Sequence, residues 1–160
     1  MPISRMNHAV LYVRDAARSA AFYRDVLGFR TVVEMPGCAF LQAPDSTNDH
    51  DIAFFSIGAG AGPSTAGRAT VGLYHLAWEV PTLGDLVALR TALADAGALV
   101  GASDHGSTKS LYARDPDGIE FEVCWILPAS ALAEDQWFGT RALDLDAELA
   151  RFGPDLVGGR

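Results

Sequence analysis

The stretch DPDGIEFEVCW, residues 115–125, combines a tight turn with an apolar strand. The turn chemistry lies in its first four residues, where the proline fixes φ and Gly118 can take a positive φ. The alternation that follows puts Glu120, Glu122 and Cys124 on one face of the strand and apolar side chains on the other. Two carboxylates on one face of an apolar strand are costly unless they are solvated or paired. This strand therefore has either a polar edge face or a carboxylate that binds a metal.

Two segments upstream of this strand follow the same plan. Each begins with a strand-like run containing a histidine and continues into an amphipathic helix. His8 lies seven residues before the helix N-cap Asp15, and His75 lies seven residues before the N-cap Thr82. This shared offset indicates an internal structural repeat.

The two halves also contain the same set of further elements. The predicted helices end at Gly28 and Gly97, and the predicted strands lie at 7–13, 31–34, 38–42, 51–57, 73–80, 98–102, 110–114 and 119–125. Each half is thus a βαβββ unit, which cannot bury its sheet alone and must pack against another. We expect an α+β fold, in which two βαβββ modules form a curved mixed sheet around a metal-binding cleft.

Composition shifts divide the chain into three regions. Module one spans about residues 4–57 and module two about 71–128, and a Gly-, Ala-, Pro- and Ser-rich linker of about 58–70 joins them. A C-terminal extension, 129–160, contains one helix candidate at 143–152. We expect its glycine-containing end to fray.

Bulk composition excludes several classes of protein. The 160 residues are 49% hydrophobic and 20% charged, as in a soluble globular domain. A net charge of −8 repels phosphate backbones, which argues against a nucleic-acid partner. No basic amphipathic stretch or membrane-length apolar run is present, so we expect no membrane partner and a cytoplasmic location. Cys38 and Cys124 are too few for a disulfide scaffold and are expected to be free thiols.

The repeat gives two of the four histidines a shared context. Packing the halves about a pseudo-twofold axis would bring the strands of His8 and His75 side by side, and Glu122 could supply a third ligand. Two imidazoles and one carboxylate leave coordination positions open, which suits non-haem Fe(II) binding both a substrate and O₂. A lone strand histidine is nevertheless more often an ordinary core or surface residue.

Three motifs carry a family resemblance. They are NHAV at 7–10, YHLA at 74–77 and DPDGIEFE at 115–122. The chain resembles, over about residues 4–128, the vicinal oxygen chelate superfamily of glyoxalase I, fosfomycin and bleomycin resistance proteins and extradiol catechol dioxygenases. In that family the metal carboxylate lies four residues after the turn glycine, which here is Glu122. The resemblance implies that His8, His75 and Glu122 bind one divalent metal.

Further pieces resemble the extradiol dioxygenase branch. HDIAF at 50–54 is similar to the segment that carries the acid–base histidine, which implies that role for His50. Tyr112 lies ten residues before Glu122, as does the active-site tyrosine of this branch. The resemblance implies that Tyr112 donates a hydrogen bond to a reacting oxygen that develops negative charge. DHGSTKSLY at 104–112 is similar to a segment that supports the active site of these enzymes. His105 matches the histidine of that segment when a gap of about two residues is allowed, which implies that His105 belongs to the site.

The resemblance thus implies a ring-cleaving dioxygenase. It would take Fe(II), with Mn, Zn or Ni as substitutes, and act on a catecholic aromatic diol with O₂. Members of this size commonly form homodimers, which we expect here. Many extradiol enzymes carry an additional N-terminal domain of the same kind, and this chain would correspond only to their catalytic half. Its closest resemblance is therefore to the single-domain type I extradiol catechol dioxygenases.

Other interpretations stay open at this point. A glyoxalase I-like isomerase needs an additional carboxylate in the strand at 52–57, which has none, and a fosfomycin-type transferase would need a basic cluster. A metal-free protein that binds an aromatic drug would not need all three ligand positions. His50 and His105 are alternatively loop residues, and Tyr112 a half-buried strand aromatic.

Overall fold

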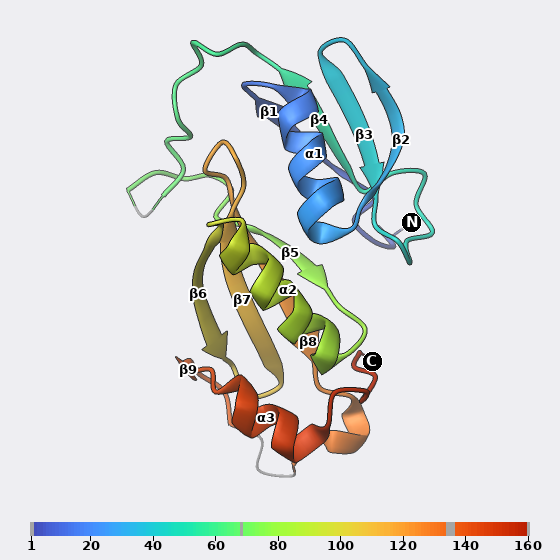
Figure 1. Ribbon diagram of the computed structural model, residues 1–160, viewed down its shortest axis with the longest axis vertical. Helices are drawn as coiled ribbons and strands as arrows, with labels where there is room; N and C mark the ends of the chain where they lie inside the picture. The colour runs from blue at the N-terminus through green and yellow to red at the C-terminus, as the bar shows by residue number, and fades with distance from the viewer. Residues whose placement is uncertain (1, 68, 134–136, 160) are drawn as a thin grey trace. The chain divides into compact units, whose positions relative to one another are not determined.

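The computed structural model describes residues 2–67, 69–133 and 137–159. The chain divides into two compact units: unit 1 is Met1–Ser64 with Pro116–Gly118, and unit 2 is Thr65–Asp115 with Ile119–Arg160. Each unit contains one mixed sheet, with α1 packed on it in unit 1 and with α2 and α3 in unit 2 (Figure 1). This confirms the α+β class. The single curved sheet of the prediction is instead two sheets, one in each unit, because the described strands form ladders only within their own unit.

Unit 1 is one βαβββ module. Its elements are β1 (Ala9–Val13), α1 (Ala16–Leu27), β2 (Arg30–Met35), β3 (Cys38–Gln42) and β4 (Ile52–Ser56). The strand order is β1-β4-β3-β2, with β1 and β4 parallel. The Asp15 side chain caps α1 by accepting hydrogen bonds from two backbone N–H groups, and Gly28, at φ 76°, ends the helix as predicted. Tyr23 of α1 is fully buried and packs on Phe54 of β4, with ring centroids 5.0 Å apart.

Unit 2 repeats this plan and adds to it. Its elements are β5 (Leu76–Glu79), α2 (Leu83–Asp95), β6 (Leu99–Asp104), β7 (Thr108–Arg114), β8 (Glu120–Ile126), a 3₁₀ turn (Ala129–Ala131), β9 (Arg141–Ala142) and α3 (Leu145–Phe152). The strand order is β5-β8-β7-β6-β9, with β5 and β8 parallel. Thr82, the predicted N-cap of α2, forms a capping box with Asp85. The short strand β9, which the sequence did not predict, pairs with the edge strand β6.

Both histidines that share this offset lie just before their strands rather than inside them. The prediction placed His8 and His75 within strands, but β1 begins at Ala9 and β5 at Leu76. The ladders start there, because Ala9 and Leu76 are the first residues with parallel partners. Each histidine therefore occupies the same place in its unit, immediately ahead of the first strand, which supports the repeat.

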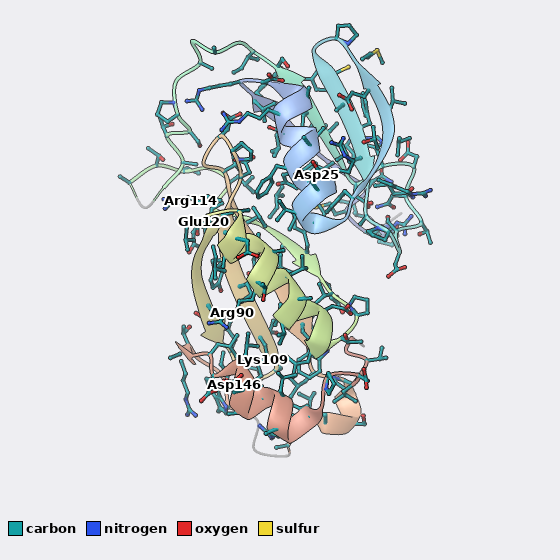
Figure 2. The ribbon with its side chains drawn as sticks, viewed as in Figure 1. Asp25, Arg90, Lys109, Arg114, Glu120 and Asp146 are labelled. Carbon is teal, nitrogen blue, oxygen red and sulfur yellow. The ribbon has the colours of Figure 1, made fainter. Side chains whose placement is uncertain are left out.

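The turn at 115–118 forms as predicted. The backbone N–H of Asp115 donates to the carbonyl of Ile119 at 3.0 Å, and Gly118 takes φ 83°. Arg114 and Glu120 lie on either side of this turn, 3.7 Å apart (Figure 2). Asp117 at its tip accepts two hydrogen bonds within unit 1, from the backbone N–H of Arg14 at 2.8 Å and from its guanidinium at 2.6 Å.

The described C-terminal residues up to Gly159 are hydrogen-bonded to the rest of unit 2, whereas the prediction expected this end to fray. The backbone N–H groups of Gly158 and Gly159 donate to the carbonyls of Pro81 and Ile126, at 2.8 and 2.9 Å. A Cβ at Gly158 would collide with Trp125 and with the carbonyl of Ile126, so only glycine fits. The glycines that suggested mobility therefore permit close packing, and the extension is part of unit 2.

Two expectations about the whole chain can be compared with the described residues. Cys38 and Cys124 are both free. None of the helices in the described part of the chain is long and apolar enough to cross a membrane.

Unit 2 buries a lysine between its sheet and its last helix. Lys109 of β7 is 1% exposed, and its Nζ lies 2.5 Å from Oδ1 of Asp104 and 3.2 Å from Oε2 of Glu148 on α3. Figure 2 shows Lys109 where the sheet meets α3. A buried charge is tolerated only when it is paired, and two carboxylates meet that need here. This ionic cluster ties the C-terminal helix to the sheet.

Replacing Lys109→Met should lower the free energy of unfolding by about 3 kcal/mol, because two carboxylates would lose their cation. Urea denaturation measures this change. The matched control is Arg90→Met on the exposed side of α2 (Figure 2), which should change the unfolding free energy by less than about 0.5 kcal/mol. Equal effects of the two substitutions would contradict the role of the cluster.

Candidate metal and catalytic site

In unit 1, His8 and His50 lie against each other. Their ring centroids are 4.4 Å apart with an interplanar angle of 33°. The parallel pairing of β1 with β4 explains this contact, since the backbone N–H of Ala9 donates to the carbonyl of Asp51 at 2.9 Å. The residues that precede the two strands are therefore neighbours. The resemblance implied an acid–base role for His50, with an ordinary loop histidine as the alternative, and the fold places its ring beside a predicted metal ligand.

The loop that carries His50 is held by its own polar side chains. Asp51 accepts hydrogen bonds from the backbone N–H of Ala43 at 2.8 Å and from the hydroxyl of Ser46 at 2.7 Å. The Asn48 amide donates to Asp51 and to the carbonyl of Asn7, both at 2.7 Å. These contacts tie the loop to the segment that leads into β1, so the position of His50 is fixed by more than its own strand.

The His50 ring is largely covered, unlike a freely solvated loop side chain. Its side chain is 15% exposed, whereas that of Asp49 is 75% exposed. Phe40 packs edge-on against the ring with centroids 5.2 Å apart. The hydrogen bond from the His50 backbone N–H lowers the pKa of Asp49 from its usual value, so Asp49 is ionised near neutral pH, 3.3 Å from Nδ1 of His50.

In unit 2, His75 and Glu122 form a close pair. Nε2 of His75 lies 3.1 Å from Oε2 of Glu122, and the side chains are 24% and 12% exposed. The parallel ladder between β5 and β8 brings them together, because Ala77 pairs with Glu122. The carboxylate is held from its other oxygen by the Ser110 hydroxyl of β7, which donates to Oε1 at 2.5 Å. Both oxygens of Glu122 thus have fixed neighbours.

This pair fits two ligands of one metal ion. Two donor atoms that each lie about 2.1 Å from a metal, at right angles, are about 3.0 Å apart. The 3.1 Å separation agrees with that figure, and also with a simple hydrogen bond. Nδ1 of His75 is buried and no hydrogen-bond partner for it is found among the described residues. The donor set is the nitrogen and oxygen type that Fe(II) and Zn(II) accept.

The predicted ligands are divided between the units. His8 belongs to unit 1, and His75 and Glu122 belong to unit 2. Within the described ranges, no three His, Cys, Asp or Glu side chains gather in a way that could hold a metal. The fold thus brings together two of the three predicted ligands, and the participation of His8 stays a prediction.

Tyr112 and His105 form a second pair in unit 2. The Tyr112 hydroxyl lies 2.9 Å from Nε2 of His105. Tyr112 is also the ladder partner of Glu122, and its ring centroid is 5.9 Å from that of His75. Within unit 2, Tyr112 therefore lies between the His75–Glu122 pair and His105, which the sequence had matched only when a gap was allowed.

Burial and the Glu122 charge control the neighbouring ionisable groups. Burial first, and then the charge of Glu122, raise the pKa of Tyr112, which keeps its phenol protonated near neutral pH. The same two effects, with a contribution from Glu79, raise the pKa of Cys124 to about 12. Cys124 therefore stays a neutral thiol, although it lies two residues from Glu122 on the same strand.

Sequence reasoning missed two features of the site. Ser110 lies two residues before Tyr112, on the same face of β7, so strand alternation offered a signal for it. Gly139 and Thr140, which contact His105, had no local signal because they act from 34 and 35 residues away.

Two curated relatives of this chain are named as dioxygenases. The chain is 40% identical over 120 residues to biphenyl-2,3-diol 1,2-dioxygenase 3 of Rhodococcus globerulus, covering 74% of this chain and 62% of that protein. It is 29% identical over 156 residues to catechol-2,3-dioxygenase of Bacillus subtilis (strain 168), covering 95% of this chain and 53% of that protein. The chain thus spans a little over half of the length of these curated relatives.

Solved structures share the fold. A glyoxylase/bleomycin resistance protein/dioxygenase domain from Frankia sp. EAN1pec superposes with a TM-score of 0.64 at 26% identity, covering 77% of this chain and 92% of that one. The family match itself extends over residues 5–123, which include the two histidine motifs and the 115–122 turn and strand. The chain therefore belongs to the Glyoxalase/Bleomycin resistance protein/Dioxygenase superfamily.

Proposed function

We propose that this protein is an extradiol ring-cleaving dioxygenase, which uses Fe(II) and O₂ to open a catecholic aromatic ring. The observation that carries the proposal is the His75–Glu122 pair at 3.1 Å with Tyr112 as the ladder partner of Glu122. Two candidate metal ligands thus lie beside the neutral phenol of Tyr112, whose pKa is raised by burial. The named activities of the Rhodococcus and Bacillus relatives support the same reaction class.

The proposed metal ligands are His8, His75 and Glu122. Bound Fe(II) would supply open coordination positions for a diol and O₂, and would thereby orient the two reactants and stabilise negative charge on the diol oxygens. The Ser110 hydroxyl fixes the direction of the Glu122 carboxylate, leaving Oε2 to face His75.

Proton transfer is assigned to His50. Its imidazole lies 4.4 Å from that of His8, close enough to receive a proton from a diol oxygen held beside His8. Phe40 and the covered loop exclude bulk water from one side of the ring. An imidazole suits this task because its usual pKa lies near neutral pH.

An isomerase of the glyoxalase type is less well supported. It would need one more carboxylate on β4, and that strand reads IAFFS. Aromatic side chains also lie beside His50 in unit 1, where Phe40 contacts both His50 and Phe55, and such rings suit the binding of an aromatic diol. A homodimer remains a prediction.

The reaction is tested by loading the protein with Fe(II) anaerobically and adding catechol, 3-methylcatechol or 2,3-dihydroxybiphenyl in air. We expect a yellow ring-fission product, followed by absorbance, that depends on Fe(II). His8→Ala should abolish the colour, because the metal would lose one of three ligands. Absence of colour from a protein shown to hold iron would overturn the dioxygenase proposal.

Replacing His50→Phe should leave Fe(II) bound and lower kcat at least about 100-fold, because the acid–base group would be gone while the ring shape stays. Iron content of the purified variant is the control, and steady-state kinetics is the measurement. Turnover at the wild-type rate would remove His50 from the mechanism.

Replacing Ser110→Ala should weaken Mn(II) binding about 10-fold, because Glu122 would lose the hydrogen bond that orients it. Calorimetric titration of the metal-free protein measures this affinity. The matched control is Ser103→Ala on the neighbouring strand β6. This substitution also removes a serine hydroxyl, but from the ladder partner of Ser110. A loss of the same size in both variants would contradict an orienting role for Ser110.

A further inference from the structure

His105 is held from both sides of its ring by different parts of unit 2. Nε2 faces the Tyr112 hydroxyl at 2.9 Å, and Nδ1 faces the carbonyl oxygen of Gly139 at 2.9 Å. The Thr140 hydroxyl lies 3.3 Å from the same Nδ1. Gly139 and Thr140 belong to the C-terminal extension, beyond residue 123 where the family match ends.

The chemistry of the Gly139 contact determines where the ring carries its proton. A carbonyl oxygen only accepts hydrogen bonds, so Nδ1 must be the donor. In the neutral ring Nε2 then has a free lone pair and accepts from the Tyr112 hydroxyl. The carbonyl of Gly139 thus fixes both the tautomer of His105 and the direction in which the Tyr112 hydroxyl points.

The segment that supplies this carbonyl is anchored. β9 follows directly and pairs with β6, where Arg141 is the partner of Asp104. The Arg141 guanidinium also lies 3.9 Å above the Trp137 ring, a favourable cation–π contact. On the other side, the backbone N–H of Gly106 donates to Asp104 at 2.8 Å, which orders the turn that carries His105. Both partners of the Nδ1–carbonyl contact are therefore held to the same edge of the sheet.

We propose that the C-terminal extension is a positioning element of the site, in which the Gly139 carbonyl holds His105 as its Nδ1–H tautomer and thereby orients Tyr112. The part assigned to Tyr112 in ring cleavage rests on the proposed function. The tautomer of His105 does not depend on the proposed function. The tautomer assignment and the proposed function can therefore be disproved independently.

The tautomer is tested on the full-length, metal-free protein labelled with ¹⁵N-histidine. Two-bond ¹H–¹⁵N spectra are recorded at pH about 8.5, where an ordinary imidazole is neutral. His105→Gln identifies the signals of His105. We expect a protonated-type shift for Nδ1 and an unprotonated-type shift for Nε2. The opposite pattern in the unsubstituted protein would overturn the proposal.

The source of the effect is tested with Gly139→Pro. Gly139 has φ +155°, and proline fixes φ near −65°, so this substitution must redirect the carbonyl. We expect the Nε2–H tautomer of His105 to become detectable or dominant, with the signals of the other histidines unchanged. The matched control is Phe138→Ala, a neighbouring side chain that is 84% exposed, and it should retain the original tautomer. An unchanged tautomer in folded Gly139→Pro would overturn the proposal, and if this variant does not fold the spectrum of the unsubstituted protein decides alone.

A kinetic readout connects this inference to the proposed reaction. In the Fe(II)-loaded enzyme, Gly139→Pro should lower kcat about 10-fold with little change in KM, because an outer hydrogen bond is lost while the metal ligands stay. No ring cleavage by any form of the protein would overturn the proposed function and leave the tautomer result standing. Full kcat together with an altered tautomer would show that the extension does not position the reacting groups.

Discussion

Parallel pairing between the first and last strands of each unit is the constraint on which the rest of the structure depends. β1 runs parallel to β4, and β5 runs parallel to β8. A parallel pair cannot be joined by a tight turn and needs a crossover connection, which here consists of a helix and two further strands in each unit. The same pairing makes neighbours of the residues ahead of the two strands in unit 1, where His8 meets His50. In unit 2 it brings His75 to Glu122.

The polar groups of unit 2 lie on opposite sides of one strand. Alternation along β7 directs Ser110 and Tyr112 toward Glu122, and Lys109 toward α3. Asp104 connects the two sides, since it pairs with Lys109 and accepts a hydrogen bond from the turn beside His105. The C-terminal extension therefore contacts both sides of the sheet: Glu148 pairs with the buried lysine on one side, and the Gly139 carbonyl contacts His105 on the side of the site. Asp104 is the residue common to the contacts that hold the C-terminal helix and to those that order the turn of His105.

Local sequence signals predicted most of the fold. Asp15, Thr82 and Gly28 act through their own backbone neighbours, so their positions alone located helix ends. Strand β3 has the predicted bounds, because alternation and turn residues surround it. The sequence did not predict β9 or the packing of Gly158, because both depend on partners far along the chain. A glycine near a chain end usually suggests a mobile backbone. At Gly158, however, the lack of a side chain allows the backbone to pack closely against Trp125.

The site was predictable to the extent that it repeats a motif. The offset of each histidine from its helix cap and the turn before Glu122 are patterns within a short stretch of sequence. A backbone hydrogen bond that decides which ring nitrogen carries a proton leaves no such pattern. The Gly139 carbonyl is an example, because every residue has a backbone carbonyl and the sequence does not mark this one. Its effect on Tyr112 is nevertheless specific. While His105 is neutral, the phenol donates to Nε2 and offers only lone pairs to its surroundings, which suits a diol oxygen that still carries its proton. Only when Nε2 also carries a proton can the phenol turn its own hydrogen toward an oxygen that has become negative. In the proposed reaction, the pair would then match the charge of the substrate oxygen as it changes, and the backbone of the extension would set the starting state.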